Sequence, residues 1–280
     1  MADQLTRALI DASDAIGRLG DDNVVFLDAS WTYPGGPQPR TTRVIPGSIR
    51  FDIDDVAEPG SRLPHTLPSP DVFSEKVSAL GISNATQVIA YDRMGVFTAP
   101  RVWWMFRVMG HDRVQVLNGG MPAWIDADGP VTDVTSQPVA PGGFKAAFRP
   151  HLYASTEDVK AGTVSAGTSI LDARSAARFA GHAAEPRPGM RAGHMPGAVS
   201  LPYTCLVDEN GYLDTCLLPA ALATNDENSI ITTCGSGVTA CIISLALYER
   251  GKDSRVYDGS WSEWGSRDDL PVETGRGAEL

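Results

Sequence analysis

The chain has few cysteines and histidines, no long hydrophobic run and a shortage of positive charge. Its 280 residues include four Cys and five His. No apolar run approaches the roughly 18 residues that a membrane-spanning helix needs. Lys and Arg number 23 against 34 Asp and Glu, which gives a formal net charge of −11. Such a surface repels nucleic acid and anionic lipid, so we expect neither nucleic acid nor a membrane as a partner.

The cysteines show no arrangement that is typical of a metal site. They are Cys205, Cys216, Cys234 and Cys241. None forms a C-x-x-C pair and no histidine cluster accompanies them, so we expect no metal. The stretch 1–20 carries acidic residues and does not read as a secretory signal, which favours a cytoplasmic location. Disulfides are rare in that reducing compartment, so at least one thiol is expected to serve chemistry.

Four sequence blocks occur twice, in the same order, in the two halves of the chain. The pairs are Val25–Ser30 with Ile170–Arg174, Ile45–Ile49 with Met195–Val199, Val88–Val96 with Ile230–Val238, and Val116–Trp124 with Val256–Trp264. This self-similarity indicates a tandem duplication. We therefore expect one domain over residues 1–130, a Pro- and Gly-rich linker over 131–150, and a second domain over 151–280.

The local patterns predict an α/β fold. Gln87–Tyr91 and Ser229–Thr233 are β-rich runs without alternation, which is typical of strands buried on both faces of a parallel sheet. Each is followed by a helical pattern, 98–109 in the first half and 238–250 in the second. Gly251 is expected to end the second helix. Strands that alternate with helices predict, in each domain, a parallel sheet flanked by helices.

Cys234 has the setting of a reactive thiol. It follows a predicted buried strand and opens a loop of small residues, Gly235-Ser236-Gly237-Val238-Thr239, before a helix. There, backbone N–H groups can converge at the positive end of the helix dipole and lower the pKa of a thiol. The same cradle would hold a persulfide anion. A lone cysteine after a strand is more often a buried apolar residue, but two glycines in the loop favour the catalytic interpretation.

Three motifs resemble those of the mercaptopyruvate sulfurtransferases, which are tandem-rhodanese enzymes. They are Cys234–Thr239, the Gly-His-Met-Pro-Gly-Ala block at Gly193–Ala198, and Tyr257–Trp264. The resemblance covers nearly the whole chain. It implies transfer of sulfur from 3-mercaptopyruvate, through a Cys234 persulfide, to a thiol acceptor such as a thioredoxin-like protein, or to cyanide. No metal or organic cofactor is implied, because sulfur itself is the carried group.

The resemblance also implies which residues form the site. Arg178 and Arg187 would bind the substrate carboxylate, since the guanidinium fork matches a carboxylate. The substrate-binding loop residues would be Gly235, Gly237, Val238 and Thr239. Ser236, His65 and Asp54 would form a proton relay that protonates the departing enolate. The alternative is that the two arginines are ordinary surface charges and that His65 is a loop residue without a role. His194 is expected to be structural.

The first half carries Asp92 at the position of Cys234. A carboxylate cannot carry sulfane sulfur, so we expect the first domain to be catalytically silent. Arg93 and Met94 replace the small loop residues, so we do not expect backbone amides to converge in this loop.

Three rival functions are weighed against this one. A thiosulfate sulfurtransferase would usually place Arg and Lys in the loop, which here carries no charge. A cysteine-dependent phosphatase would close its loop with Arg, whereas Ala240, Cys241 and Ile242 follow Thr239. A non-enzymatic rhodanese-type binding module would have a degenerate loop, and only the first half has one.

Overall fold

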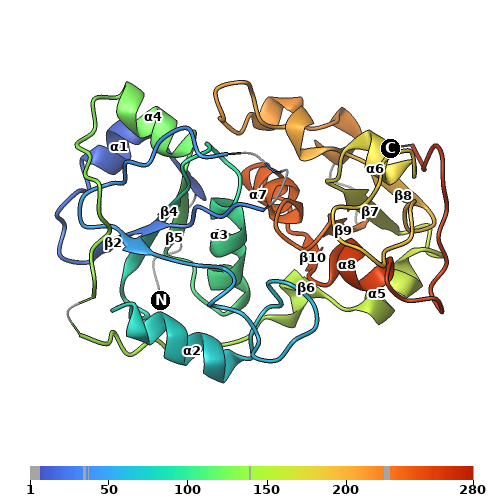
Figure 1. Ribbon diagram of the computed structural model, residues 1–280, viewed down its shortest axis with the longest axis horizontal. Helices are drawn as coiled ribbons and strands as arrows, with labels where there is room; N and C mark the ends of the chain where they lie inside the picture. The colour runs from blue at the N-terminus through green and yellow to red at the C-terminus, as the bar shows by residue number, and fades with distance from the viewer. Residues whose placement is uncertain (1–6, 34–35, 37, 139, 224–227, 280) are drawn as a thin grey trace. The chain divides into compact units, whose positions relative to one another are not determined.

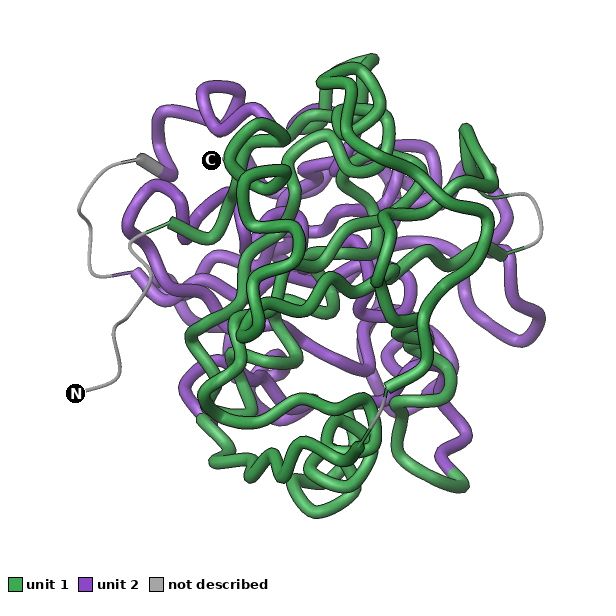
Figure 2. The backbone as a smooth tube through the Cα atoms, turned by 90° about the vertical axis from the view of Figure 1, so that its left-hand side faces the viewer, with its two compact units in different colours: residues 1–60, 67–149, 207–213 green, residues 61–66, 150–206, 214–280 purple. Residues whose placement is uncertain are grey.

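The protein is described by a computed structural model, which covers residues 7–33, 36, 38–138, 140–223 and 228–279 (Figure 1). Residues 1–6 of the N-terminal stretch and Val139 of the expected linker lie outside the described residues. The chain divides into two compact units (Figure 2). Unit 1 consists of Met1–Gly60, Leu67–Arg149 and Val207–Leu213, and unit 2 of Ser61–Thr66, Pro150–Leu206 and Asp214–Leu280. Each unit thus takes in one short segment from the other half of the sequence.

Unit 1 is built on a five-stranded sheet in which every strand pairing is parallel. The strand order is β1-β5-β4-β2-β3. The strands are β1 (Leu9–Ile10), β2 (Val24–Asp28), β3 (Ile49–Arg50), β4 (Gln87–Tyr91) and β5 (Val114–Leu117). The helices are α1 (Ala12–Ile16), α2 (Pro70–Ala79), α3 (Ala99–Val108) and α4 (Gly120–Asp126). Helices α1 and α4 pack together, and α3 packs on β4 and β5 (Figure 1).

Unit 2 repeats this topology, with the strand order β6-β10-β9-β7-β8, again all parallel. The strands are β6 (Tyr153–Ala154), β7 (Thr168–Asp172), β8 (Ala198–Ser200), β9 (Ser229–Thr233) and β10 (Arg255–Tyr257). The α-helices are α5 (Thr156–Gly162), α6 (Ala176–Phe179), α7 (Ala240–Glu249) and α8 (Ser260–Trp264). The 3-10 turns are η1 (Pro150–Leu152), η2 (Tyr203–Cys205), η3 (Thr215–Leu217) and η4 (Ala220–Ala223). The predicted pair of parallel α/β folds is confirmed.

The two cores use the repeated blocks in the same way. The tryptophans that end the fourth block, Trp124 of α4 and Trp264 of α8, are both fully buried. Trp124 meets the ring of Phe26 at 5.6 Å between centroids, and Trp264 meets that of Tyr257 at 6.5 Å. Burial of each large aromatic side chain is favourable by about 25 cal/mol for every Å² of apolar surface removed from water. These contacts hold the helix that follows β5 or β10 against its own sheet.

Helix α7 ends as the sequence predicts. Gly251 has a left-handed φ of 77°, and the next N–H, that of Lys252, donates to the Leu247 carbonyl at 3.0 Å. A left-handed residue lets the chain turn back and satisfy the last carbonyls of the helix, which glycine does without steric cost.

The stretch expected as a linker packs along unit 1. Thr132 exchanges two backbone hydrogen bonds of 2.9 Å with Val44, and the Ser136 N–H donates to the Ser48 carbonyl at 2.7 Å. Phe144 is 2% exposed and its ring meets that of Phe73 edge-on. The extended chain thus satisfies backbone groups beside the edge strand β3 before unit 2 begins at Pro150. Proline and glycine content alone does not distinguish an extended segment that packs on a domain from a linker without such contacts.

Among the described residues, no helix has the length and apolar character needed to cross a membrane.

Candidate functional site

Cys234 lies at the carboxyl end of β9, in the middle of the unit 2 sheet, and is 2% exposed. Its backbone is fixed by the start of α8. The Trp261 N–H donates to the Cys234 carbonyl at 3.0 Å. The N–H and hydroxyl of Ser262 both donate to the Gly235 carbonyl, at 2.8 and 2.7 Å. The thiol is therefore held in place by backbone contacts that do not depend on its own chemistry.

Ser260 is a site residue that the sequence analysis missed. Its side chain is fully buried, and its Oγ accepts from the Cys234 N–H at 3.1 Å and lies 4.0 Å from Cys234 Sγ. The residue has a left-handed φ of 50°, which costs a non-glycine residue roughly 1 kcal/mol or more. The repeat places Gly120, with a φ of 55°, at the same position of unit 1. A serine where the sister repeat has glycine was the available signal.

Arg178 lies over the loop that follows Cys234. Its Nη2 is 3.0 Å from the place where a Cβ on residue 235 would be, so glycine there leaves room for the guanidinium. An ion pair with Glu185, whose side chain is 2% exposed, holds the fork in position. The Nε of Arg178 is buried and has no hydrogen-bond partner among the described residues. The structure thus brings this predicted arginine to the loop with a donor group still to be satisfied.

Glu185 is itself anchored by Arg174, which the sequence analysis also missed as part of the site. Arg174 Nη1 donates to Glu185 at 2.9 Å, and its Nη2 donates to Asp172 at 2.7 Å. Its guanidinium stacks on the Trp261 ring at 4.2 Å. Burial lowers the pKa of Arg174, but the carboxylates of Asp172 and Glu185 outweigh it and raise the pKa. The chain of ion pairs from Asp172 to Arg178 gives the latter a defined orientation.

Arg187 and His65 are brought together within unit 2, because Ser61–Thr66 belongs to that unit. Arg187 Nη2 lies 3.5 Å from His65 Nε2, and His65 is 5% exposed with a left-handed φ of 54°. Ser236, 8% exposed, is in the same unit. Asp54 belongs to unit 1, where its carboxylate accepts from Trp31 Nε1 at 2.8 Å. The relay of Ser236, His65 and Asp54 stays a prediction.

The other predicted loop residues and the remaining thiols are also placed. Gly237 and Val238 are buried and Thr239 is half-buried. Cys241 is buried in α7 with its Sγ 3.3 Å from the Gly237 carbonyl, whereas Cys205 and Cys216 are exposed.

His194 has the contacts of a structural residue. It is fully buried, its Nδ1 lies 2.9 Å from the Phe179 carbonyl, and its ring stacks on that of Phe179 at 3.9 Å.

In unit 1 the loop after β4 holds a carboxylate in place of the thiol. Asp92 is fully buried, and four backbone N–H groups donate to its side chain at 2.8 to 3.1 Å. They belong to Met94, Phe97, Thr98 and Ala99. Burial raises the pKa of this carboxyl, and the four amide hydrogen bonds oppose that rise without cancelling it. The expectation that amides would not converge in this loop was wrong, because the strand and helix on either side orient them whatever the side chains.

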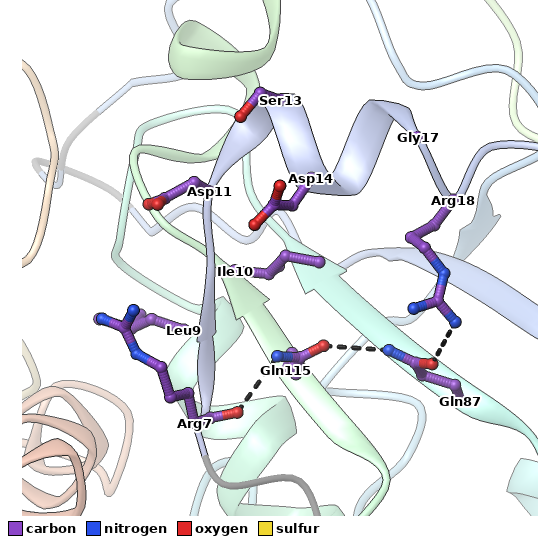
Figure 3. A pocket seen from close by; sticks show the side chains of 10 residues that line it. All are labelled: Arg7, Leu9, Ile10, Asp11, Ser13, Asp14, Gly17, Arg18, Gln87 and Gln115. Atoms are coloured by element: carbon purple, nitrogen blue, oxygen red, sulfur yellow. Dashed lines mark hydrogen bonds between the residues drawn. The ribbon is translucent and has the colours of Figure 1, made fainter.

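Two of the pockets are lined by residues of unit 1. One, of about 550 Å³, lies beside α1 and the amino-terminal ends of β4 and β5 (Figure 3). Its floor is a chain of side-chain hydrogen bonds from Arg18 to Gln87 at 2.7 Å and from Gln87 to Gln115 at 3.0 Å. The other, of about 440 Å³, includes Asp54. Among the described residues, no group of three or more His, Cys, Asp or Glu is placed to hold a metal ion.

Fold and site together define a class. A parallel α/β domain that presents a thiol on a short loop between its central strand and the next helix is a cysteine-dependent transfer domain, here joined to a duplicate without the thiol. The family model described as "Rhodanese-like domain" matches residues 11–127 and 155–267. The chain belongs to the tandem rhodanese sulfurtransferase family and is a sulfurtransferase.

Relatives with two different donor names are similar to the chain to nearly the same degree. Human 3-mercaptopyruvate sulfurtransferase is 38% identical over 98% of each chain. Rat thiosulfate sulfurtransferase is 41% identical over 92% of this chain and 89% of its own. The crystal structure of the 3-mercaptopyruvate sulfotransferase SseA from Escherichia coli matches with a TM-score of 0.79 and 33% identity, over 91% of this chain and 99% of that one.

Proposed function

We propose that the chain transfers the sulfur of 3-mercaptopyruvate to a thiol, through a persulfide on Cys234. The observation that carries this proposal is the cradle in unit 1, where the loop equivalent to Cys234–Thr239 holds the Asp92 anion on four amides. By the repeat, we infer that the N–H groups of residues 236, 239, 240 and 241 are the ones directed at the Cys234 sulfur. A thiolate or persulfide there is stabilised without any basic side chain in the loop.

Two half-reactions balance the transfer. The Cys234 thiolate attacks the sulfur of 3-mercaptopyruvate, so that an S–S bond forms while the carbon–sulfur bond breaks. The electron pair of the broken bond stays on the departing carbon as the enolate of pyruvate, which then takes up one proton. A thiol acceptor attacks the outer sulfur of the persulfide and leaves with it, and Cys234 returns as a thiolate.

Arg178 is the proposed partner of the substrate carboxylate. Its Nη2 is paired with Glu185, and its Nη1 lies 3.7 Å from the place where a Cβ on residue 235 would be. A carboxylate that binds Nη1 would lie beside Gly235, next to the attacking sulfur. Arg187 is proposed to act with it from its place beside His65.

Ser236, His65 and Asp54 are proposed as the groups that deliver the proton to the enolate. Ser236 is two residues after the nucleophile, and His65 is buried in the same unit. A hydroxyl hydrogen-bonded to an imidazole can pass a proton to a developing carbanion.

The proposed acceptor is a thiol, such as a reduced thioredoxin-like protein, and no cofactor enters either half-reaction. The proposed location is the cytoplasm, where thiols are kept reduced. Unit 1 is proposed to be silent in catalysis because Asp92 already fills its cradle with a fixed anion.

Steady-state kinetics with both donors tests the choice of substrate. We expect kcat/KM for 3-mercaptopyruvate to exceed that for thiosulfate by at least about tenfold, which needs about 1.4 kcal/mol of differential transition-state binding. Thiosulfate is a compact dianion and needs positive charge in the loop, so Ser236→Lys should shift the preference toward it. Equal or better activity of the unmodified chain with thiosulfate would favour the thiosulfate sulfurtransferase instead.

Arg178→Ala should raise KM for 3-mercaptopyruvate, because it removes the carboxylate's partner. Arg255→Ala is the matched control. Arg255 also forms an ion pair, with Asp158 at 3.0 Å, and its side chain is 27% exposed against 21% for Arg178. Arg255 lies at the amino-terminal end of β10, whereas Cys234 follows the carboxyl end of the parallel strand β9. Its loss should therefore leave KM unchanged. An equal effect of both substitutions would contradict the assigned role of Arg178.

A further inference from the structure

The buried carboxylate of Asp92 is bound by backbone groups alone. Its Oδ2 accepts from the N–H groups of Phe97 and Thr98 at 2.8 Å and of Ala99 at 3.1 Å, and its Oδ1 from Met94 at 3.0 Å. No cationic side chain pairs with it among the described residues. The neighbouring Arg93 is directed instead to Ser30, at 3.0 Å from its Nε, and to Asp28.

This arrangement has the components of an oxyanion site. Three of the four amides lie where the ten-residue helix α3 begins: Ala99 is its first residue, Thr98 its N-cap and Phe97 the residue before, and the helix dipole favours negative charge there. Four charge-assisted hydrogen bonds offset part of the cost of burying the charge. In the native chain the bound anion is the carboxylate of Asp92, a side chain of the same loop.

The cradle does not need that side chain to keep its shape. The Asp92 carbonyl accepts from the Met121 N–H at 2.9 Å, and the Val96 N–H donates to the Gly211 carbonyl at 2.8 Å. These bonds fix the loop on both sides of the cradle through main-chain atoms. Removal of the carboxylate would therefore leave four converging donors around a small cavity, each costly to leave unsatisfied.

We propose that the loop after β4 is an oxyanion-binding site in its own right, occupied in the native chain by Asp92. A free small carboxylate binds there once the side chain's own carboxylate is removed. The chemical class follows from the donor set: a planar anion with two oxygens, no larger than the group that was lost. The catalytic silence of unit 1 would then come from occupancy of its cradle and not from loss of the cradle.

The test is rescue of Asp92→Ala by formate, which supplies one carbon and two carboxylate oxygens. Thermal unfolding of the full chain is compared in sodium formate and in sodium chloride of equal concentration. We expect Asp92→Ala to melt below the wild type in chloride, and formate to restore at least half of the lost melting temperature with a saturable dose response. Asp92→Asn is the matched control, because the asparagine side chain fills the cavity. The melting temperatures of this variant and of the wild type should be the same in formate as in chloride.

Hydrogen exchange locates the bound anion. The amides of Phe97, Thr98 and Ala99 should exchange faster in Asp92→Ala than in the wild type, and formate should slow them again. If Asp92→Ala does not fold in chloride, refolding from urea is compared in the two salts, and formate should raise the recovery of native protein. Equal salt responses of all three proteins, or no recovery by formate, would overturn the proposal. These readouts are independent of sulfur transfer and of its donor.

Discussion

The four cysteines differ in what surrounds their sulfur atoms. Cys205 and Cys216 are exposed on short 3-10 turns, and Cys241 is buried within α7. Cys234 alone follows the central strand of its sheet. We expect Cys234→Ser to abolish sulfur transfer, while a serine at each of the other three positions retains substantial turnover. Intact-mass spectrometry after incubation with the donor checks this: a sulfur adduct that persists in Cys234→Ser would contradict it.

Ser260 allows a sharper test at the same scale. Ser260→Gly reproduces the glycine of unit 1, so the backbone conformation and the fold should be kept. The hydroxyl is lost, and with it the acceptor for the Cys234 N–H at 3.1 Å and the donor to the Tyr257 carbonyl at 2.8 Å. We expect persulfide formation in single-turnover experiments to slow by about tenfold, the value of one such bond. An unchanged rate together with unchanged stability would show that Ser260 only shapes the loop.

The residues of the site were predictable where sequence neighbours define them. Cys234 and Asp92 are recognised from the strand before them and from the duplication. Glu185 was not, because its contact with Arg174 across eleven positions depends on how α6 and the following loop fold back. The left-handed conformation of Ser260 is not visible in the serine itself, and only its alignment with Gly120 in the other repeat could have indicated it.

At the scale of elements, the loop after β4 shows that the size of its side chains does not decide whether its backbone amides converge. We expected the amides of such a loop to converge only when its residues are small. Arg93 and Met94 are large, and the amides of this loop converge nevertheless. Strand and helix fix the direction of the chain on either side, and the loop is further fixed by a hairpin formed around the Val207–Leu213 bridge. That hairpin could not be predicted as part of unit 1, because its sequence lies in the other half of the chain.

A pair of glycine substitutions measures how closely this hairpin packs. A Cβ on Gly211 would lie 2.8 Å from the Gly95 Cα, whereas a Cβ on Gly251 would meet nothing within 4 Å. Both glycines have left-handed φ values, 90° and 77°, so alanine costs each about 1 kcal/mol in backbone strain. We expect Gly211→Ala to lower the free energy of unfolding by at least about 1 kcal/mol more than Gly251→Ala, as measured by urea denaturation. Equal losses would mean that the hairpin moves away without cost.

At the scale of the whole molecule, the duplication made the architecture predictable, since each half repeats one strand-and-helix order. The exchange of short segments between the units, Ser61–Thr66 and Val207–Leu213, was not predictable. Neither segment has a pattern of its own, and their placement depends on contacts distant in sequence. His65 belongs to one of them, which is how a residue of the first half comes to lie beside Arg187.

The stability of the whole chain should depend on pH through His111. This histidine is 3% exposed and packs against the rings of Phe106 and Phe144, each at 5.5 Å between centroids. Burial lowers its pKa from 6.5 to about 4. Between these values the unfolded chain binds a proton that the folded chain does not. The free energy of unfolding therefore falls as the pH falls through this window, by up to about 1.4 kcal/mol per pH unit.

The variant His111→Phe should remove this dependence, because another phenyl ring fills the same aromatic cluster and carries no titratable group. Urea unfolding of the wild type and the variant is measured from pH 6.5 down to about 4, the window set by the two pKa values. Other groups titrate in both proteins, so the informative quantity is the difference between the two curves. We expect that difference to grow in favour of the variant as the pH falls. His151→Gln, which removes an exposed histidine, should stay parallel to the wild type. If the His111→Phe curve also stays parallel, protonation of His111 does not oppose folding, and the aromatic cluster must tolerate the charged ring.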